Sequence, residues 1–301
     1  MCSGLFSQLL FCINRCGLFD AYIATCILIL KPKQIEKSFV IFGVVNALFG
    51  ILQEIVYLIS NKILIGSQGG QDVWYLFGVR LLRVEGLVGD SNVFALYLII
   101  PLILIFYDYL LKPNLRTLTL VIVMFTSLVL TFSRGGLLGA IIGIILVCLY
   151  RRSIRAMIWF VILTACSAAV FIVRIGSRSD TTRMFLLSYA INIWKDNPFW
   201  GVGPGKFGSL WGNTTAHNLI LESLSETGIF ATLLIIFMLA IGFIMLHKKK
   251  KLAMSMALKG FYISSLFLSV LTNTLFWTAM GIMFVSAPLP KLLLKDDKIK
   301  L

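Results

Sequence analysis

The chain has 301 residues, of which 59% are hydrophobic and 13% are charged, and its mean hydropathy is +0.94. Soluble domains carry about 25% charged residues, so this chain cannot cover a water-facing surface, and an ordinary soluble fold is excluded. The net charge of +14 comes without an arginine–aromatic patch, which argues against a nucleic-acid partner. In a membrane protein, such an excess of Lys and Arg marks the cytoplasmic loops.

The apolar segments are long and continuous, which predicts membrane-spanning helices of about 20 residues each. In chain order these are Ser38–Ser60, Asn92–Leu110, Thr117–Phe132, Gly135–Tyr150, Ala156–Val173, Leu219–Leu246 and Gly260–Ala287. An interruption at Thr272–Thr274 favours a hairpin of two short helices in the last segment, and Leu5–Leu30 forms either one span or two. We therefore predict an all-α polytopic membrane protein with about 8–10 transmembrane helices, forming a single integral membrane domain over residues 1–301.

The short connections between the spans are basic, and they fall on alternate sides of successive spans. Their cations lie in Lys31–Lys37, Lys112–Arg116, Arg151–Arg155, Lys248–Lys251 and at Lys259. We place this face in the cytoplasm. The extracytoplasmic face then holds two long loops, Asn61–Ser91 (residues 61–91) and Arg174–Asn218 (residues 174–218), and long loops in compact architectures are usually functional.

The second loop contains a stretch of helical spacing, Arg183–Asp196. Its apolar face is formed by Met184, Leu187, Ala190, Ile191 and Trp194. This pattern predicts an amphipathic helix at the membrane interface that begins at Arg183, with Asp180, Thr181 and Thr182 available as caps. Gly and Pro residues at 197–205 then force an irregular turn.

Arg134 and His217 are candidates for chemistry at the extracytoplasmic face. Arg134 lies between two spans and is followed by two glycines. It either snorkels to lipid phosphates or binds a phosphate with its guanidinium fork, in which case the glycines let a bulky anion approach. His217 closes the long loop just before a span, where it is either a buried structural residue or a general base.

Glu222 and Glu226 follow His217 on the same helix. Carboxylates inside an apolar span are expensive and are usually functional or paired. Glu222 is expected either to orient His217 or to pair with an Arg, and Glu226 either forms a helix–helix hydrogen bond or acts in the site.

The first loop adds further candidates for substrate contact. These are Arg80, Arg83, Glu85, Asp90 and Asn92. A solvated loop is the better interpretation for Arg80 and Glu85, and Asp90–Asn92 also fits a cap of the following helix. The six cysteines lie in or beside apolar segments, so neither a disulfide framework nor a metal site is predicted.

Three stretches together resemble the O-antigen ligase and O-antigen polymerase family of bacterial membrane glycosyltransferases. They are Gly89–Ala95, Thr131–Gly136, and a longer pattern with Arg183, Trp194, Asn197–Gly203, His217-Asn218 and Glu226–Phe230. The resemblance extends over roughly Ser38–Ile244.

The resemblance implies transfer of a glycan from an undecaprenyl diphosphate lipid to a saccharide acceptor at the outer face of a bacterial inner membrane, without a cofactor or an essential metal. The acceptor is a lipid A core sugar for a ligase and another lipid-linked saccharide for a polymerase. By matching position, Arg134 and Arg183 would bind the diphosphate and His217 would act on the acceptor hydroxyl. We expect Arg80, Arg83, Asn92, Arg178, Asn218 and Glu222 to contact the substrates. Membrane lipids are partners, and a chain-length regulator is a possible further one.

Two other classes of function remain open from the sequence. A transporter or flippase of a lipid-linked or anionic solute would place ionisable residues at mid-membrane and often shows inverted repeats. Here the candidate residues gather at one face and we find no repeat. The other class is a non-catalytic scaffold of an envelope assembly.

Overall fold

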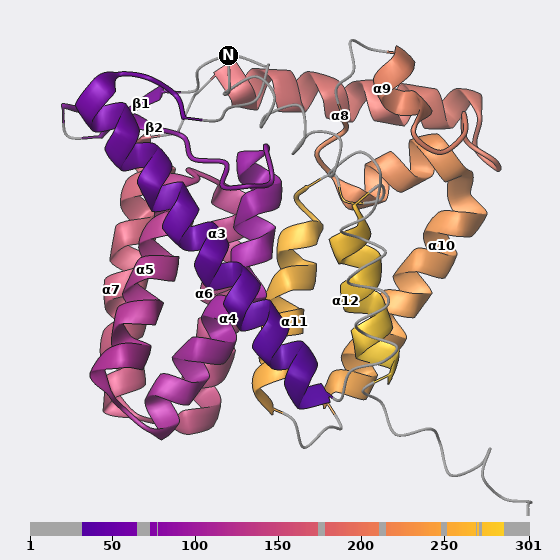
Figure 1. Ribbon diagram of the computed structural model, residues 1–301. Coiled ribbons are helices and arrows are strands. Elements are labelled where there is room, and N and C mark those ends of the chain that lie inside the picture. Colours follow the sequence, from indigo (N-terminus) through magenta and orange to yellow (C-terminus); the bar gives the residue numbers. More distant parts are fainter. Residues whose placement is uncertain are drawn as a thin grey trace, which may run out of the picture.

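The computed structural model describes residues 32–64, 73–76, 78–173, 178–210, 215–247, 252–268, 270 and 273–285. The segment Leu5–Leu30, Arg174 and the basic tail Lys291–Lys300 lie outside these residues. Within them, eight helices form a bundle: α3 (Pro32–Ser60), α4 (Ser91–Leu111), α5 (Leu115–Leu130), α6 (Arg134–Arg151), α7 (Ile154–Val173), α10 (Leu219–His247), α11 (Leu252–Ser265) and α12 (Thr274–Val285). Figure 1 shows them running up and down between the two ends of the molecule.

The fold is that of a multi-pass membrane protein, as predicted. Five helices are long and apolar enough to cross a membrane, namely α3, α4, α6, α7 and α10. The helices α5, α11 and α12 have 16, 14 and 12 residues and are shorter than a full span of about 20. The break between α11 and α12 confirms the expected hairpin of two short helices.

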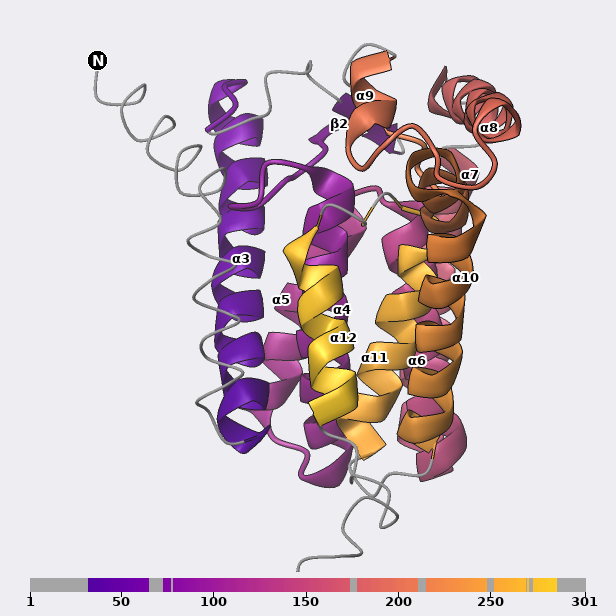
Figure 2. The same cartoon turned by 90° about the vertical axis from the view of Figure 1, so that its right-hand side faces the viewer.

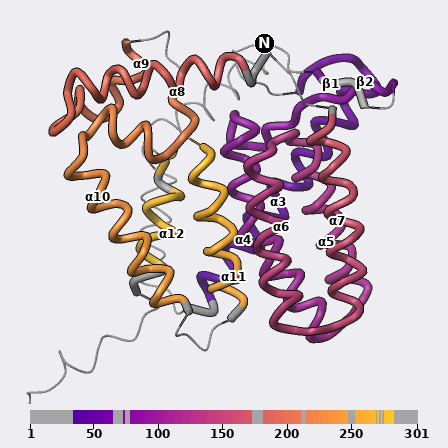
Figure 3. Tube along the Cα trace, turned by 180° about the vertical axis from the view of Figure 1, so that it is seen from behind, coloured from indigo at the N-terminus to yellow at the C-terminus, as the bar shows by residue number. Residues whose placement is uncertain are grey.

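One end of the bundle carries the α4–α5 and α6–α7 connections, and the other carries a separate layer. The turns at 112–114 and 152–153 lie at the first end, whereas α8 (Arg178–Asp196), α9 (Lys206–Leu210) and a β-hairpin lie across the second (Figures 1 and 3). In Figure 1, α8 runs across the end of the bundle, and Figure 2 shows it nearly end-on above α10. The layer is therefore built from the two long loops.

The β-hairpin was not predicted. Strands β1 (Val73–Leu76) and β2 (Val79–Leu82) pair antiparallel, with Tyr75 opposite Arg80. Four-residue strands within a loop of mixed composition give no alternating pattern long enough to recognise.

Helix starts follow from capping residues. The carboxylate of Asp90 accepts hydrogen bonds from the backbone N–H groups of Asn92 and Val93, both at 2.8 Å, and thereby caps α4. Ser133 caps α6 by accepting from the N–H of Gly136 at 3.3 Å. The expectation that Asp90–Asn92 forms a cap is confirmed.

Three predicted boundaries or faces were wrong. Helix α8 begins at Arg178 rather than Arg183, because Asp and Thr suit the first turn of a helix as well as its cap. Its buried side chains are Leu186, Ala190 and Ile193, whereas Met184 is 67% exposed, so the buried face is rotated from the predicted one. Helix α11 begins at Leu252, which places Lys259 inside a helix instead of a cytoplasmic connection.

The span at Leu219–Leu246 is also not one straight helix. Gly228 interrupts α10 with φ 76° and ψ −176°. This left-handed φ is available to glycine at little cost.

Helices α6 and α11 pack tightly and extensively against each other. A Cβ added to Gly139 would lie 2.5 Å from Cβ of Ser264 and 2.6 Å from the carbonyl oxygen of Gly260. Ser264 also donates its hydroxyl to the carbonyl of Gly135 at 2.8 Å. Small residues at such crossings let helix backbones approach in a membrane.

Gly139→Ala is therefore expected to destabilise the protein by about 1–3 kcal/mol, since the added methyl overpacks a backbone contact. Thermal unfolding in detergent measures this. Gly281→Ala in α12 is the matched control, because nothing lies within 4 Å of its added Cβ. Equal unfolding temperatures for the two variants would contradict the prediction.

Candidate active site

Two of the sequence motifs meet at Asn92. Its Oδ1 accepts hydrogen bonds from Nη2 of Arg83 at 2.9 Å and from the hydroxyl of Ser133 at 3.2 Å. Nε of Arg83 also donates to the carbonyl of Thr131 at 3.0 Å. Asn92 thus joins the first loop to the α5–α6 turn and holds the Arg83 guanidinium.

Polar side chains of α3 hold the first loop in place, and sequence reasoning missed them. Oε1 of Gln53 accepts from the N–H groups of Glu85 (3.2 Å) and Gly86 (2.9 Å), and Asn46 Oδ1 accepts from the N–H of Leu87 (3.2 Å). A carboxylate oxygen of Glu54 accepts from the N–H of Leu82 at 2.9 Å. The signal was present, because positions 46, 53 and 54 are polar and share one face of an apolar helix.

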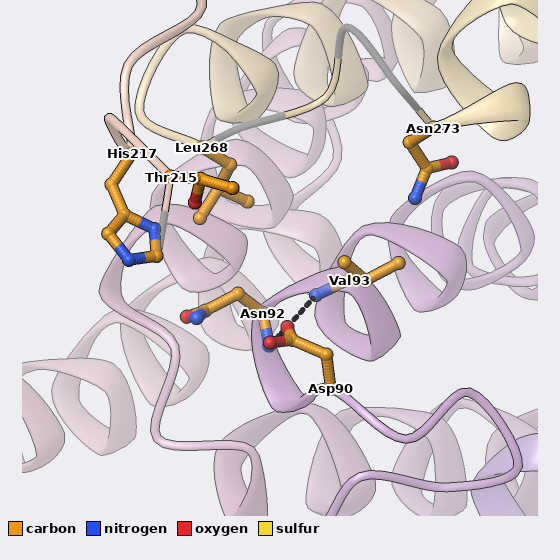
Figure 4. Close-up of a pocket in the computed structure, with 7 residues that line it drawn as sticks. All are labelled: Asp90, Asn92, Val93, Thr215, His217, Leu268 and Asn273. Carbon is orange, nitrogen blue, oxygen red and sulfur yellow. Dashed lines mark hydrogen bonds between the residues drawn. The ribbon is translucent and has the colours of Figure 1, made fainter. Parts of the chain in front are cut away.

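A pocket of about 240 Å³ opens beside Asn92. Its lining residues are Asp90, Asn92, Val93, Thr215, His217, Leu268 and Asn273. Figure 4 shows the His217 ring and the Asn92 amide on one side of the pocket and the Asn273 amide on the other. The pocket therefore joins the start of α4, the segment before α10 and the break between α11 and α12.

Helices α4, α10 and α12 all begin at this pocket, so that their N-termini lie around it. Asn218 caps α10 by accepting from the N–H groups of Ile220 (3.1 Å) and Leu221 (3.0 Å), and Asn273 accepts from the N–H of Leu275 (2.8 Å). Each helix N-terminus carries a partial positive charge of about +0.5. Their convergence makes the potential at the pocket favourable for an anion.

His217 is held in an uncommon backbone conformation, with φ 51°. Left-handed φ values cost free energy in residues other than glycine, and they gather at functional sites. Phe132, which precedes the cap of α6, has φ 49°. Both strained residues belong to motifs that were identified in the sequence.

The electrostatic surroundings keep His217 neutral. Burial, and then the positive charge of Arg183, lower its pKa from 6.5 to about 4; Arg83 adds to this effect and Asp90 opposes it. The imidazole is therefore neutral at neutral pH and can accept a proton, as base catalysis requires. The same interactions show that Arg183 and Arg83 are close enough to act on one group at the pocket.

The other predicted site residues are distributed unevenly. Arg134 is the first residue of α6, next to Ser133, and Arg178 is the first residue of α8. Glu222 is buried in the first turn of α10. Arg80, in contrast, is exposed on the hairpin with its guanidinium 5.7 Å from the centre of the Tyr57 ring, and it does not line the pocket.

The glycines after Arg134 pack against helices. A Cβ on Gly136 would lie 2.4 Å from Cβ of Ala95, so this glycine is required for the contact of α6 with α4. Gly135 is buried beside Phe267 and Leu268. Helix packing is thus the role that the structure gives these two residues.

Glu226 fixes the Gly- and Pro-rich turn onto α10. Its two carboxylate oxygens accept from the N–H groups of Gly205 (2.8 Å) and Phe207 (3.1 Å), and its carbonyl accepts from the N–H of Gly203 (2.8 Å). The kink at Gly228 makes room for this turn, because a Cβ there would lie 2.1 Å from the carbonyl oxygen of Phe199. Of the two roles expected for Glu226, the structure shows hydrogen bonding. The partners are backbone N–H groups of the turn and of the start of α9.

A small apolar cluster transmits this attachment to the pocket. It consists of Leu186, Ala190, Ile193, Phe207 and Ala216. Phe207 is itself hydrogen-bonded to Glu226. Ala216 precedes His217, and Leu186 lies one turn after Arg183. The cluster therefore ties the position of α8 to that of the His217 segment.

Residues 119–236 match the family model described as O-antigen ligase. This region is similar to O-antigen ligases. The family predicted from the motifs is confirmed here, over a shorter range than the resemblance itself covered. Neither the curated proteins nor the solved structures contain a match to the chain.

The matched region runs from α5 through α6, α7, α8 and α9 into α10. It contains Arg134, Arg183 and His217, whereas Arg83 and Asn92 precede it. The family supports a membrane protein that processes glycans, and it implies lipid-linked glycan substrates. Within the residues that the structure describes, no group of three or more His, Cys, Asp or Glu side chains could hold a metal ion.

Proposed function

We propose that this chain transfers a glycan from an undecaprenyl diphosphate lipid to a hydroxyl of a saccharide acceptor, at the extracytoplasmic face of a bacterial inner membrane. The observation that carries the proposal is that His217 lines a pocket of helix N-termini, that the charges of Arg183 and Arg83 act on it, and that it lies in the region similar to O-antigen ligases. The acceptor is either a lipid A core sugar, as for a ligase, or another lipid-linked glycan, as for a polymerase.

In the proposed reaction the acceptor oxygen attacks the anomeric carbon of the donor sugar. The new bond joins these two atoms, the bond between the anomeric carbon and the phosphate oxygen breaks, and the hydroxyl proton passes to the imidazole of His217. The lipid diphosphate leaves with the bonding electrons. Arg183, Arg134 and the helix N-termini stabilise the negative charge that develops on it.

Binding of the donor also prepares the base. A diphosphate beside Arg183 and Arg83 offsets the positive charges that lower the pKa of His217. The imidazole then becomes a stronger proton acceptor only when the donor is bound.

The charge distribution supports the orientation. The α4–α5 and α6–α7 connections lie at the end of the bundle opposite α8 and the hairpin (Figure 1). The cations in and beside these connections are Lys112, Arg116, Arg151, Arg152 and Arg155. Cytoplasmic connections collect such cations, which supports our assignment of the pocket end to the extracytoplasmic face.

Arg183→Ala is expected to lower transfer by about 100-fold or more in proteoliposomes that contain a lipid-diphosphate glycan and candidate acceptors, since it removes a cation from the leaving group. Lys195→Ala is the matched control, because Lys195 is an exposed cation in the last turn of the same helix. Equal activity in both variants would contradict the assigned role of Arg183. Directional solute uptake without glycan transfer would instead indicate a transporter.

A further inference from the structure

Three aromatic side chains form an exposed cluster at the kink of α10. Phe199, Trp200 and Phe230 are 57%, 79% and 57% exposed. The ring centres of Phe199 and Trp200 both lie 5.9 Å from that of Phe230. These rings contact one another and leave their outer surfaces uncovered.

The cluster continues the lipid-facing surface of α10. Below Phe230, the large exposed apolar side chains of this helix are Leu233, Leu234, Ile236, Phe237 and Ile244. Helix α10 is long and apolar enough to cross a membrane, and little of its surface is buried inside the protein. The medium that covers Leu233 and Phe237 therefore reaches Phe230 and the two rings that contact it.

The position along α10 is that of a membrane boundary. Glu226, just before the kink at Gly228, is buried and accepts hydrogen bonds from the backbone N–H groups of Gly205 and Phe207. Phe230, just after the kink, begins the exposed apolar surface. Trp and other aromatic side chains are enriched where the acyl region meets the headgroups, because their rings are apolar and the indole N–H is polar.

The turn that carries Phe199 and Trp200 is firmly attached to α10. The N–H of Ile229 donates to the carbonyl of Pro198 at 3.0 Å, and Nε1 of Trp194 donates to the same carbonyl at 3.2 Å. The N–H of Val202 donates to the carbonyl of Ser225 at 2.9 Å. A force on the rings is therefore transmitted to the end of α8 and the start of α10.

We propose that Phe199, Trp200 and Phe230 form an interfacial anchor that inserts into the headgroup–acyl boundary of the bilayer. The anchor sets the depth of the layer formed by α8 and the segment before α10. It holds Arg183 and His217 at the level of the lipid headgroups, where the charged group of a membrane-embedded lipid lies. This role goes beyond glycan transfer and does not require it.

Fluorescence quenching in proteoliposomes of brominated phosphatidylcholine tests the anchor. The difference between wild type and Trp200→Phe isolates the emission of Trp200 while keeping an aromatic ring in place. We expect most of this difference emission to be quenched by bromine near the glycerol end of the acyl chain, and little of it by iodide in the aqueous phase. Trp277→Phe is the control for a membrane-embedded indole, because Trp277 is 41% exposed on the apolar helix α12.

The opposite pattern would overturn the anchor. Strong iodide quenching of the Trp200 emission, with no effect of bromine at any depth, would place the indole in water and make the cluster a surface for a soluble partner. Thermal unfolding of Trp200→Phe at the wild-type temperature shows that the difference spectrum reports the ring and not misfolding. Because no glycan is present, the outcome is independent of the proposed transfer reaction.

Discussion

Replacing His217 with alanine is expected to lower kcat for glycan transfer by about 10²- to 10⁴-fold, the usual contribution of a general base. Donor binding should change little, since the cations at the pocket remain. The measurement is transfer in proteoliposomes together with binding of the lipid-diphosphate donor. Parallel loss of binding and transfer would instead give His217 a structural role.

The pH dependence separates a base from a structural histidine. The pKa of His217 is lowered to about 4 in the free enzyme, so the neutral form predominates above this pH. Activity is then lost as the pH falls through that value, and the acid limb of kcat/KM lies near pH 4. In the donor complex, diphosphate charge raises this pKa, so the acid limb of kcat lies at higher pH than that of kcat/KM.

The variant Arg183→Gln tests whether the positive charge of Arg183 lowers the pKa of His217. Arg183 is the second-largest cause of the lowered pKa, after burial. Its removal raises the pKa of His217, and the acid limb of kcat/KM moves to higher pH. The control variant Lys195→Gln leaves the limb in place. An unchanged limb in Arg183→Gln would show that His217 is not the titrating base.

The spans were predictable because bilayer thickness dictates the length of each apolar segment. The segment Asn92–Leu110 differs from α4 by one residue at each end. Irregular features depended instead on partners distant in sequence. The buried face of α8 is chosen by Phe207 and Ala216, which follow it in the chain, and nothing within 178–196 identifies them.

The candidate site shows the same division. Arg83 and Arg80 are both arginines of the first loop, and composition cannot separate them. Arg83 approaches Asn92 because β2 ends beside the α5–α6 turn, whereas Arg80 lies over Tyr57 of α3. Asn218 was expected to bind substrate, yet its side chain oxygen caps α10. A motif thus indicates where a site lies, and tertiary contacts decide which residues face it.

Glu226→Gln is expected to release the turn at 202–207 and to abolish most transfer, although Glu226 does not line the pocket. The carboxylate offers two acceptors to the N–H groups of Gly205 and Phe207. Glutamine keeps one acceptor and turns an N–H₂ donor toward the other backbone N–H. Loss of one such buried bond, with two donors left facing each other, costs about 2–4 kcal/mol.

Hydrogen exchange of the peptide that contains Gly205 and Phe207 measures this release directly, alongside kcat and thermal unfolding. Asp196→Asn is the matched control, since it neutralises an exposed carboxylate at the end of α8. Faster exchange with wild-type kcat would show that Glu226 contributes to protein stability and not to catalysis. Faster exchange with a lowered kcat supports the route from Glu226 through Phe207 and Ala216 to His217, because the cluster that loses its attachment is the one that seats the base beside Arg183.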